Sequence, residues 1–243
     1  FKLYESFIKP AANFMTEYVD EKTGLPHASY DLWEEKFLTN TYTVAITHKA
    51  LLVASSFAEK FEYADDALTW KSAANKIANN LDTLYDEELG YYIKGYYLNE
   101  AMELVFDKTL DVSSFYGGVM FGQNVFNTDK LNSTAKAIQE KLMAKTPIGG
   151  SPRYENDQYF KSNPPQIGNP WHITTLWMAQ YYLGLNNIET AQKLIQYSID
   201  HALTSGVLSE QMDPNNGNPL SVAPLVWSHA EFINTVLDLS LAT

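Results

Sequence analysis

Two segments, far apart in the 243-residue chain, carry carboxylates beside aromatic and amide side chains. Residues 29–35 read Ser-Tyr-Asp-Leu-Trp-Glu-Glu, and residues 208–214 read Leu-Ser-Glu-Gln-Met-Asp-Pro. Hydrolysis of a glycosidic bond needs one carboxylic acid beside the leaving oxygen and a second carboxylate that attacks carbon or activates water. The two segments therefore predict a paired acid and base, with Glu34 and Glu210 as the candidates.

Both carboxylate segments also have a purely structural interpretation, which the sequence leaves open. Asp31, Glu34 and Glu35 are typical of the acidic first turn of a helix, where the helix dipole favours negative charge. Glu210 is equally compatible with a solvated loop. The chemistry depends on how the chain folds around these residues.

A third polar segment begins at Pro147 and carries Arg153 and Tyr154. A guanidinium group can donate to two sugar hydroxyls at once, and a phenol can stack or donate. Trp33 and Trp171 are candidates for aromatic walls against the C–H faces of a sugar. The alternatives are an arginine in an ion pair and tryptophans that fill the core.

The apolar spacing predicts the elements that must position these segments. Apolar residues three and four positions apart predict helices, and the tyrosine-rich residues 89–98 predict a strand. A polar loop from residue 147 is extended by Asn163 to Pro170. Because helices follow one another in pairs without alternating strands, we expect an all-α fold with its long loops on one face. The predicted helices cover 3–19, 39–61, 64–85, 112–122, 128–144, 171–185, 188–203 and 221–241.

The composition excludes several classes of function. A net charge of −12 without a block of basic residues excludes nucleic-acid and anionic-membrane partners. Cysteine is absent, and His172 and His229 lack the spacing of metal ligands. No nucleophile elbow, phosphate loop or dinucleotide fingerprint occurs, so we expect no metal and no cofactor. We also expect no membrane helix and no signal peptide in this chain, and the compartment stays open.

Four segments, in order along the chain, resemble glycoside hydrolase family 15, which comprises the glucoamylases and related glucodextranases and trehalases. They are residues 25–35, residues 168–177 (Gly-Asn-Pro-Trp-His-Ile-Thr-Thr-Leu-Trp), residues 208–214 and residues 219–232. The resemblance implies an (α/α)6 toroid and an inverting, exo-acting α-glucosidase that releases β-glucose from α-linked oligosaccharides or polysaccharides. In its motifs Glu34 corresponds to the general acid and Glu210 to the general base.

The resemblance also implies roles for the neighbouring residues. Asp31 corresponds to a residue that supports the acid, and Glu35 to one that hydrogen-bonds the sugar beside the scissile bond. Arg153 and Tyr154 correspond to residues that hold hydroxyls of the terminal glucose, and Trp171 to an aromatic residue of the same pocket.

An (α/α)6 toroid has twelve helices, whereas we predict about eight here. We therefore expect residues 1–243 to form one incomplete catalytic domain, the C-terminal two thirds, with the N-terminal segment of the same protein as a partner. Trehalase or glucodextranase specificity is an alternative. A non-catalytic carbohydrate-binding fragment is another, and a helical protein scaffold would leave the loop residues unexplained.

Overall fold

The computed structural model describes residues 2–122, 125–161 and 168–243. Residues 163–167 of the predicted Asn163 to Pro170 loop extension lie outside the described residues. The described residues contain eight α-helices, and the prediction of an all-α fold is confirmed. The helices are α1 Lys9–Glu17, α2 Thr41–Lys60, α3 Ala64–Ala78, α4 Val112–Phe121, α5 Thr128–Lys141, α6 His172–Gly184, α7 Ile188–Asp200 and α8 Val226–Ala242.

Short strands and short helical turns connect these helices. The turns are a π-helical turn at Tyr4–Ile8 and 3-10 turns at Leu81–Leu84 and Met143–Lys145. The strands are β1 Ser29–Tyr30, β2 Phe37–Asn40, β3 Tyr85–Asp86, β4 Tyr91–Leu98, β5 Leu104–Leu110, β6 Gln211–Met212 and β7 Pro219–Leu220. None of the helices in the described ranges is both long and apolar enough to span a bilayer.

The chain divides into two compact units. The first unit comprises residues 1–108 and 113–133, and the second comprises residues 109–112 and 134–243. The organisation of residues 1–243 as one barrel domain stays a prediction.

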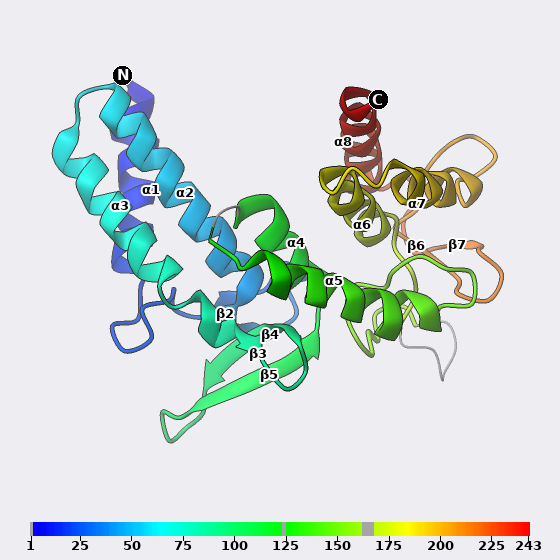
Figure 1. Ribbon diagram of the computed structural model, residues 1–243, viewed down its shortest axis with the longest axis horizontal. Helices are drawn as coiled ribbons and strands as arrows, with labels where there is room; N and C mark the ends of the chain where they lie inside the picture. The colour runs from blue at the N-terminus through cyan, green and yellow to red at the C-terminus, as the bar shows by residue number, and fades with distance from the viewer. Residues whose placement is uncertain (1, 123–124, 162–167) are drawn as a thin grey trace. The chain divides into compact units, whose positions relative to one another are not determined.

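In the first unit, α1, α2 and α3 lie side by side (Figure 1). Helices α2 and α3 correspond to the predicted helices 39–61 and 64–85, and their packed faces bury Leu51, Trp70 and Ile77 completely. Tyr4 stacks on Tyr63 with ring centroids 4.2 Å apart. These apolar contacts hold α2, and the sheet is attached at its N-terminal end.

A five-stranded sheet adjoins the N-terminus of α2. Its order is β1-β2-β4-β3, and β5 pairs with β4, which forms the strand predicted at residues 89–98. Antiparallel pairing aligns Thr39 with Tyr96 and Asn40 with Gly95. β2 runs directly into α2, where the Asn40 side chain accepts a hydrogen bond from the Thr43 N–H, 2.8 Å away. Strands β1 and β2, which the apolar spacing did not indicate, form a hairpin that carries residues 31–36.

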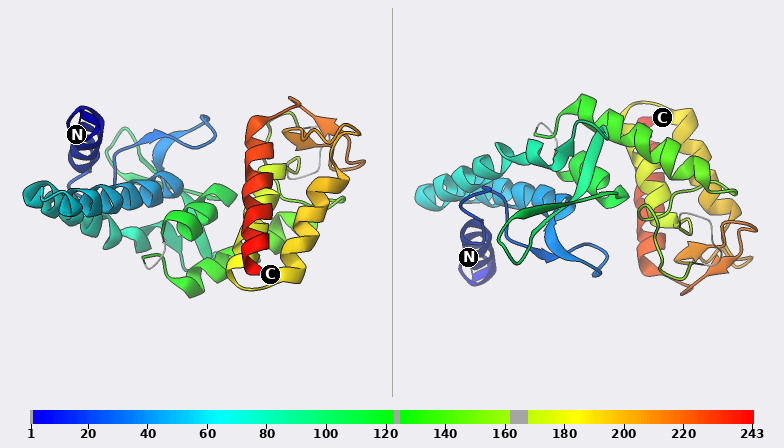
Figure 2. Two further views of the ribbon diagram at one scale, coloured as in Figure 1. Left: turned by 90° about the horizontal axis from the view of Figure 1, so that it is seen from above. Right: turned by 90° about the horizontal axis from the view of Figure 1, so that it is seen from below.

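In the second unit, α6 packs against both α7 and α8, and Figure 2 shows α8 running beside α7. Twelve of the thirteen residues of α6, from His172 to Leu183, are buried. A helix that is buried on all its faces lies within a core. Because α6 is buried, its N-terminus is fixed in place, and so is the preceding residue, Trp171.

Two local features determine how helices α4 and α5 begin and pack. Thr128 is a residue type that favours a helix N-cap, but the cap of α5 is Asn127, whose side-chain oxygen accepts from the Lys130 N–H at 3.1 Å. Gly117 permits close packing of α4 on α2, because a Cβ atom at Gly117 would lie 3.0 Å from the Cα atom of Tyr42 in α2.

Candidate active site

Glu34 lies on a tight turn, residues 31–36, at the tip of the β1–β2 hairpin in the first unit. Pairing of Ser29 with Leu38 and of Tyr30 with Phe37 leads the chain into and out of this turn. The backbone N–H of Asp31 donates to the Lys36 carbonyl at 2.9 Å and so closes it. α2 begins only at Thr41 and has no acidic residue in its first turn. The interpretation of the carboxylates as the first turn of a helix is therefore wrong.

Asp31 organises the turn from inside. Its Oδ1 atom accepts hydrogen bonds from the backbone N–H groups of Glu35 and Lys36, at 2.9 and 3.3 Å. Its Oδ2 atom lies 2.8 Å from the Nζ atom of Lys94 in β4, and both side chains are buried. At the end of the turn, Lys36 forms an ion pair of 2.6 Å with Asp107 of β5. The turn is thus attached to two neighbouring strands.

Glu34 itself is exposed and has a backbone φ of 58°. A positive φ is uncommon for residues other than glycine, and such conformations cluster at functional sites. In the part of the chain that the structure describes, no hydrogen bond or ion pair reaches the Glu34 carboxylate. Trp33 beside it is buried, with 8% of its surface exposed, whereas Glu35 is exposed. The turn therefore presents two carboxylates on a rigid support.

The second unit brings together three segments that are distant in sequence. The backbone of Trp171 pairs with Ser151 on one side and with Gln211 on the other. The Trp171 N–H donates to the Ser151 carbonyl at 2.9 Å, and the Met212 N–H donates to the Pro170 carbonyl at 3.0 Å. This short ladder places the Arg153 loop, the start of α6 and the Glu210 segment next to one another.

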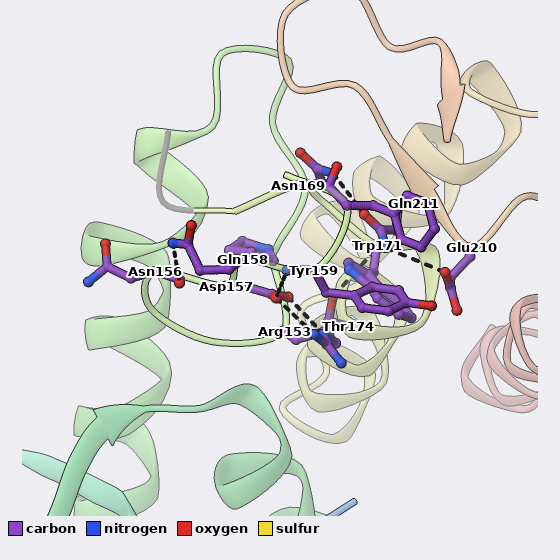
Figure 3. Close-up of polar contacts among 12 residues, drawn as sticks. Arg153, Asn156, Asp157, Gln158, Tyr159, Asn169, Trp171, Thr174, Glu210 and Gln211 are labelled. Carbon is purple, nitrogen blue, oxygen red and sulfur yellow. Dashed lines mark hydrogen bonds and ion pairs between the residues drawn. The ribbon is translucent and has the colours of Figure 1, made fainter. Parts of the chain in front are cut away.

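Arg153 is the centre of a cluster of rings (Figure 3). Its guanidinium carbon lies 5.1, 5.0 and 4.9 Å from the ring centroids of Tyr154, Tyr159 and Trp171. Its Nε and NH2 groups donate to the two carboxylate oxygens of Asp157 at 2.7 and 2.8 Å. Both partners are buried. Arg153 is therefore an ion-paired arginine, as one alternative held, and it also belongs to an aromatic surface.

Glu210 lies immediately before β6 and is half-buried. Its Oε2 atom accepts a short hydrogen bond from the Ser221 hydroxyl and a longer one, of 3.4 Å, from the Gln211 amide. The Glu210 N–H donates to the Val222 carbonyl at 2.9 Å. The interpretation as a freely solvated loop is wrong, because the carboxylate is oriented by its neighbours.

An amide network links Glu210 to the aromatic cluster. The Asn169 side chain donates to the Gln211 side-chain oxygen at 2.8 Å and to the Phe160 carbonyl at 2.7 Å. Phe160 is next to Tyr159, whose ring packs at 6.1 Å against that of Trp171. Figure 3 shows Asn169, Gln211, the rings of Tyr159 and Trp171, and Glu210 in one group. The cluster and the carboxylate consequently belong to one local structure.

The sequence assigned no role to several residues that position these groups. Ser221, Asn169 and Gln211 lie within the segments that carry the family resemblance, but nothing in their spacing indicated their contacts. Lys94 had a usable signal, because a charged residue inside an otherwise apolar strand requires a partner when it is buried.

Among the described residues, no cluster of three or more histidine, aspartate or glutamate side chains has the arrangement of a metal site. His172 is completely buried, and both its ring nitrogens lack a hydrogen-bond partner in the described part of the chain. Burial, together with nearby His201 and His229, lowers the pKa of His172 to about 4. His172 is therefore neutral at pH 7.

The sequence profile of glycosyl hydrolases family 15 matches residues 4–188 and 184–237. The chain belongs to this family.

Curated relatives include proteins of different specificity. The chain is 28% identical to an uncharacterized glycosyl hydrolase of Methanocaldococcus jannaschii over 97% of its own length and 37% of that protein. It is 25% identical to a glucoamylase of Blastobotrys adeninivorans, covering 85% of this chain and 43% of the relative. It is also 25% identical to trehalase 2 of Sulfolobus acidocaldarius, covering 86% and 34%. The chain thus spans less than half the length of each of these relatives.

Solved structures show the fold. A bacterial glucoamylase in complex with acarbose has a TM-score of 0.83 at 22% identity, over 100% of this chain and 38% of that one. The glucoamylase of Saccharomycopsis fibuligera has a TM-score of 0.78 at 18% identity, over 99% and 62%. These likenesses confirm the assignment to an incomplete (α/α)6 toroid.

Proposed function

We propose that the protein is an inverting, exo-acting α-glucosidase that releases β-glucose from the non-reducing ends of α-linked glucose oligosaccharides or polysaccharides. Membership of glycosyl hydrolases family 15 and the glucoamylase relatives support this proposal. The observation that carries it is the local structure around Glu210, in which a half-buried, oriented carboxylate belongs to the same network as the ring cluster of Arg153.

In this mechanism Glu34 donates a proton to the glycosidic oxygen as the bond to the anomeric carbon breaks. Glu210 removes a proton from a water molecule, whose oxygen attacks the same carbon from the opposite face. The configuration changes from α to β, and the two carboxyl groups exchange protons with solvent before the next turnover. An inverting enzyme holds its carboxyl groups about 6.5–9.5 Å apart to accommodate this water. That separation, between residues of different units, stays a prediction.

The residues around each carboxylate have corresponding roles. In the first unit, Asp31 holds the turn that presents Glu34, Glu35 accepts hydrogen bonds from hydroxyls of the sugar beside the scissile bond, and Trp33 provides an aromatic wall. In the second unit, Arg153 and Tyr154 bind hydroxyls of the terminal glucose, and Trp171 lies against its ring. An aromatic surface suits the C–H face of a sugar, and a guanidinium group donates to hydroxyls.

The test combines a substrate panel with paired variants. We expect glucose release from maltose and maltotriose, with β-glucose as the first anomer seen by proton NMR. Hydrolysis of trehalose would indicate trehalase specificity, and hydrolysis of isomaltose would indicate glucodextranase specificity. Glu34→Gln and Glu210→Gln should each lower kcat by about 10²–10⁴-fold, the usual range for loss of general acid–base catalysis.

Glu62→Gln is the matched control, because Glu62 is also an exposed glutamate, with φ of 67°. Wild-type turnover in the Glu34 and Glu210 variants would refute the proposal. Binding of maltose without any turnover in calorimetry would instead favour a carbohydrate-binding protein.

A further inference from the structure

Lys94 is a charged residue in the middle of a buried strand. The first six residues of β4, from Tyr91 to Tyr96, are all buried, and the Lys94 side chain is 2% exposed. An ammonium group is rarely removed from water unless a partner compensates its charge. The partner of Lys94 therefore indicates why this strand tolerates it.

One partner is Asp31, which lies 63 positions earlier in the chain and three residues before Glu34. The Nζ atom of Lys94 lies 2.8 Å from Oδ2 of Asp31, whose side chain is 3% exposed. A buried ion pair seldom stabilises a fold more than apolar side chains of similar volume, because both charges lose their hydration. Its benefit is more often a defined geometry than stability.

The geometry that this ion pair defines is that of the turn. The two oxygens of the Asp31 carboxylate have different partners, since Oδ2 contacts Lys94 and Oδ1 accepts the N–H groups of Glu35 and Lys36. β4, which carries Lys94, pairs with β2, into which the turn continues. Asp31 thus joins the turn to the neighbouring strand, and the fixed turn keeps Glu34 in its left-handed conformation.

We propose that Lys94 is a positioning residue for the general acid, acting through its buried ion pair with Asp31. This inference rests on the proposed function, in which Glu34 protonates the leaving group. Loss of the amine leaves the Asp31 carboxylate buried without its cation. The carboxylate then rotates, the N–H groups of the turn lose a fixed acceptor, and Glu34 moves away from the glycosidic oxygen.

The test uses two substrates that differ in their need for an acid. The sugar leaving group of maltotriose departs with a proton, whereas the fluoride of α-glucosyl fluoride departs as an anion without one. For Lys94→Met we expect kcat on maltotriose to fall by about tenfold to a hundredfold, as for a misplaced catalytic group, with KM nearly unchanged. Turnover of α-glucosyl fluoride should remain close to that of the wild type.

Thr41→Val is the matched control for simple destabilisation. The Thr41 hydroxyl is buried and donates to the carbonyl of Ile93, the neighbour of Lys94, at 2.7 Å. This variant should unfold more easily but keep the wild-type ratio of the two activities. Equal losses on both substrates in Lys94→Met would overturn the inference, since a merely structural role predicts that result.

The double variant Asp31→Asn/Lys94→Met covers the case in which Lys94→Met does not fold. It has no buried charge at this position, and it should show a selective loss on maltotriose no larger than that of Asp31→Asn alone. A wild-type activity ratio, or losses that multiply, would show that Lys94 does not act through Asp31. Glu34→Gln separates the two proposals: if it retains turnover, the proposed function fails, and if only the Lys94 variants behave as wild type, the inference alone fails.

Discussion

The two carboxylate segments are held in opposite ways. In the first unit, Glu34 has no side-chain partner among the described residues, and its position is set by the backbone of a turn that Asp31 fixes. In the second unit, the Glu210 carboxylate itself accepts hydrogen bonds from Ser221 and Gln211. The acid candidate is thus positioned through its backbone, and the base candidate through its carboxylate.

This difference suits the two proposed catalytic roles. A general acid must hold a proton and release it to the leaving oxygen, and a hydroxyl donating to its carboxylate would compete for that position. A general base needs a carboxylate oxygen aimed at water while its other oxygen is held. The contrast supports the assignment of Glu34 as acid and Glu210 as base, and it can be tested in both units.

The largest effect should come from removing each carboxylate and comparing leaving groups. Glu34→Gln should lose about 10³-fold in kcat on maltotriose, within the range for loss of a general acid, and much less on α-glucosyl fluoride. Glu210→Gln should lose activity on both substrates, because both reactions need an activated water. Steady-state kinetics on the two substrates measure this directly, and the opposite pattern would exchange the two roles.

The next effect concerns two buried ion pairs, Asp31 with Lys94 in the first unit and Asp157 with Arg153 in the second. Breaking a buried pair costs about 3–5 kcal/mol because the remaining charge is left uncompensated. Asp157→Asn, which leaves Arg153 without its bidentate partner, should therefore lower the urea midpoint substantially, as should Asp31→Asn. The functional consequences should differ: Asp157→Asn raises KM through the loosened ring cluster, whereas Asp31→Asn lowers kcat.

The surface pair of Lys193 and Glu189 in α7 provides the control for ion-pair loss. Lys193→Gln should leave both the urea midpoint and the kinetic constants as they are, because exposed pairs contribute little. If Asp157→Asn also left the urea midpoint and the kinetic constants unchanged, the ion pair would contribute nothing to the stability of the Arg153 cluster.

The sequence predicted local structure well and long-range partners poorly. Spacing indicated α2, α3 and α7, and residues 89–98 indicated β4, because periodicity depends on neighbours in the chain. The pair of Asp31 and Lys94 joins residues 63 positions apart, and Asn169 meets Gln211 across 42 positions. No local pattern encodes such contacts. The motifs therefore indicated which side chains matter for chemistry, but not what holds them.

The third prediction concerns how the free energy of unfolding depends on pH. Burial lowers the pKa of His172 from 6.5 to about 4, so that below pH 6.5 the unfolded chain binds a proton that the folded chain does not. Stability is therefore lost as pH falls from about 6.5 towards 4. Because one pKa unit corresponds to about 1.4 kcal/mol, the loss should be about 2 kcal/mol at pH 5.

His172→Phe should remove this part of the acid sensitivity without removing a hydrogen bond. Urea unfolding at pH 7 and pH 5 measures the change in both proteins. In the first unit, burial also lowers the pKa of His48, so some acid sensitivity should persist in the variant. An identical loss of stability in wild type and variant would mean that His172 is hydrated or paired in solution.

The smallest effect tests the direct support of the base. Ser221 is held at a φ of 61° and donates its hydroxyl to Oε2 of Glu210, so Ser221→Ala removes a single hydrogen bond from the carboxylate. A hydrogen bond to a charged group contributes about 1.5–3 kcal/mol, and its exposure here favours the lower end, a loss of about tenfold in kcat. Because the base serves both substrates, maltotriose and α-glucosyl fluoride should be affected equally. This equal loss is the reverse of the selective loss expected for Lys94→Met, and a selective loss in Ser221→Ala would place Glu210 on the side of the leaving group.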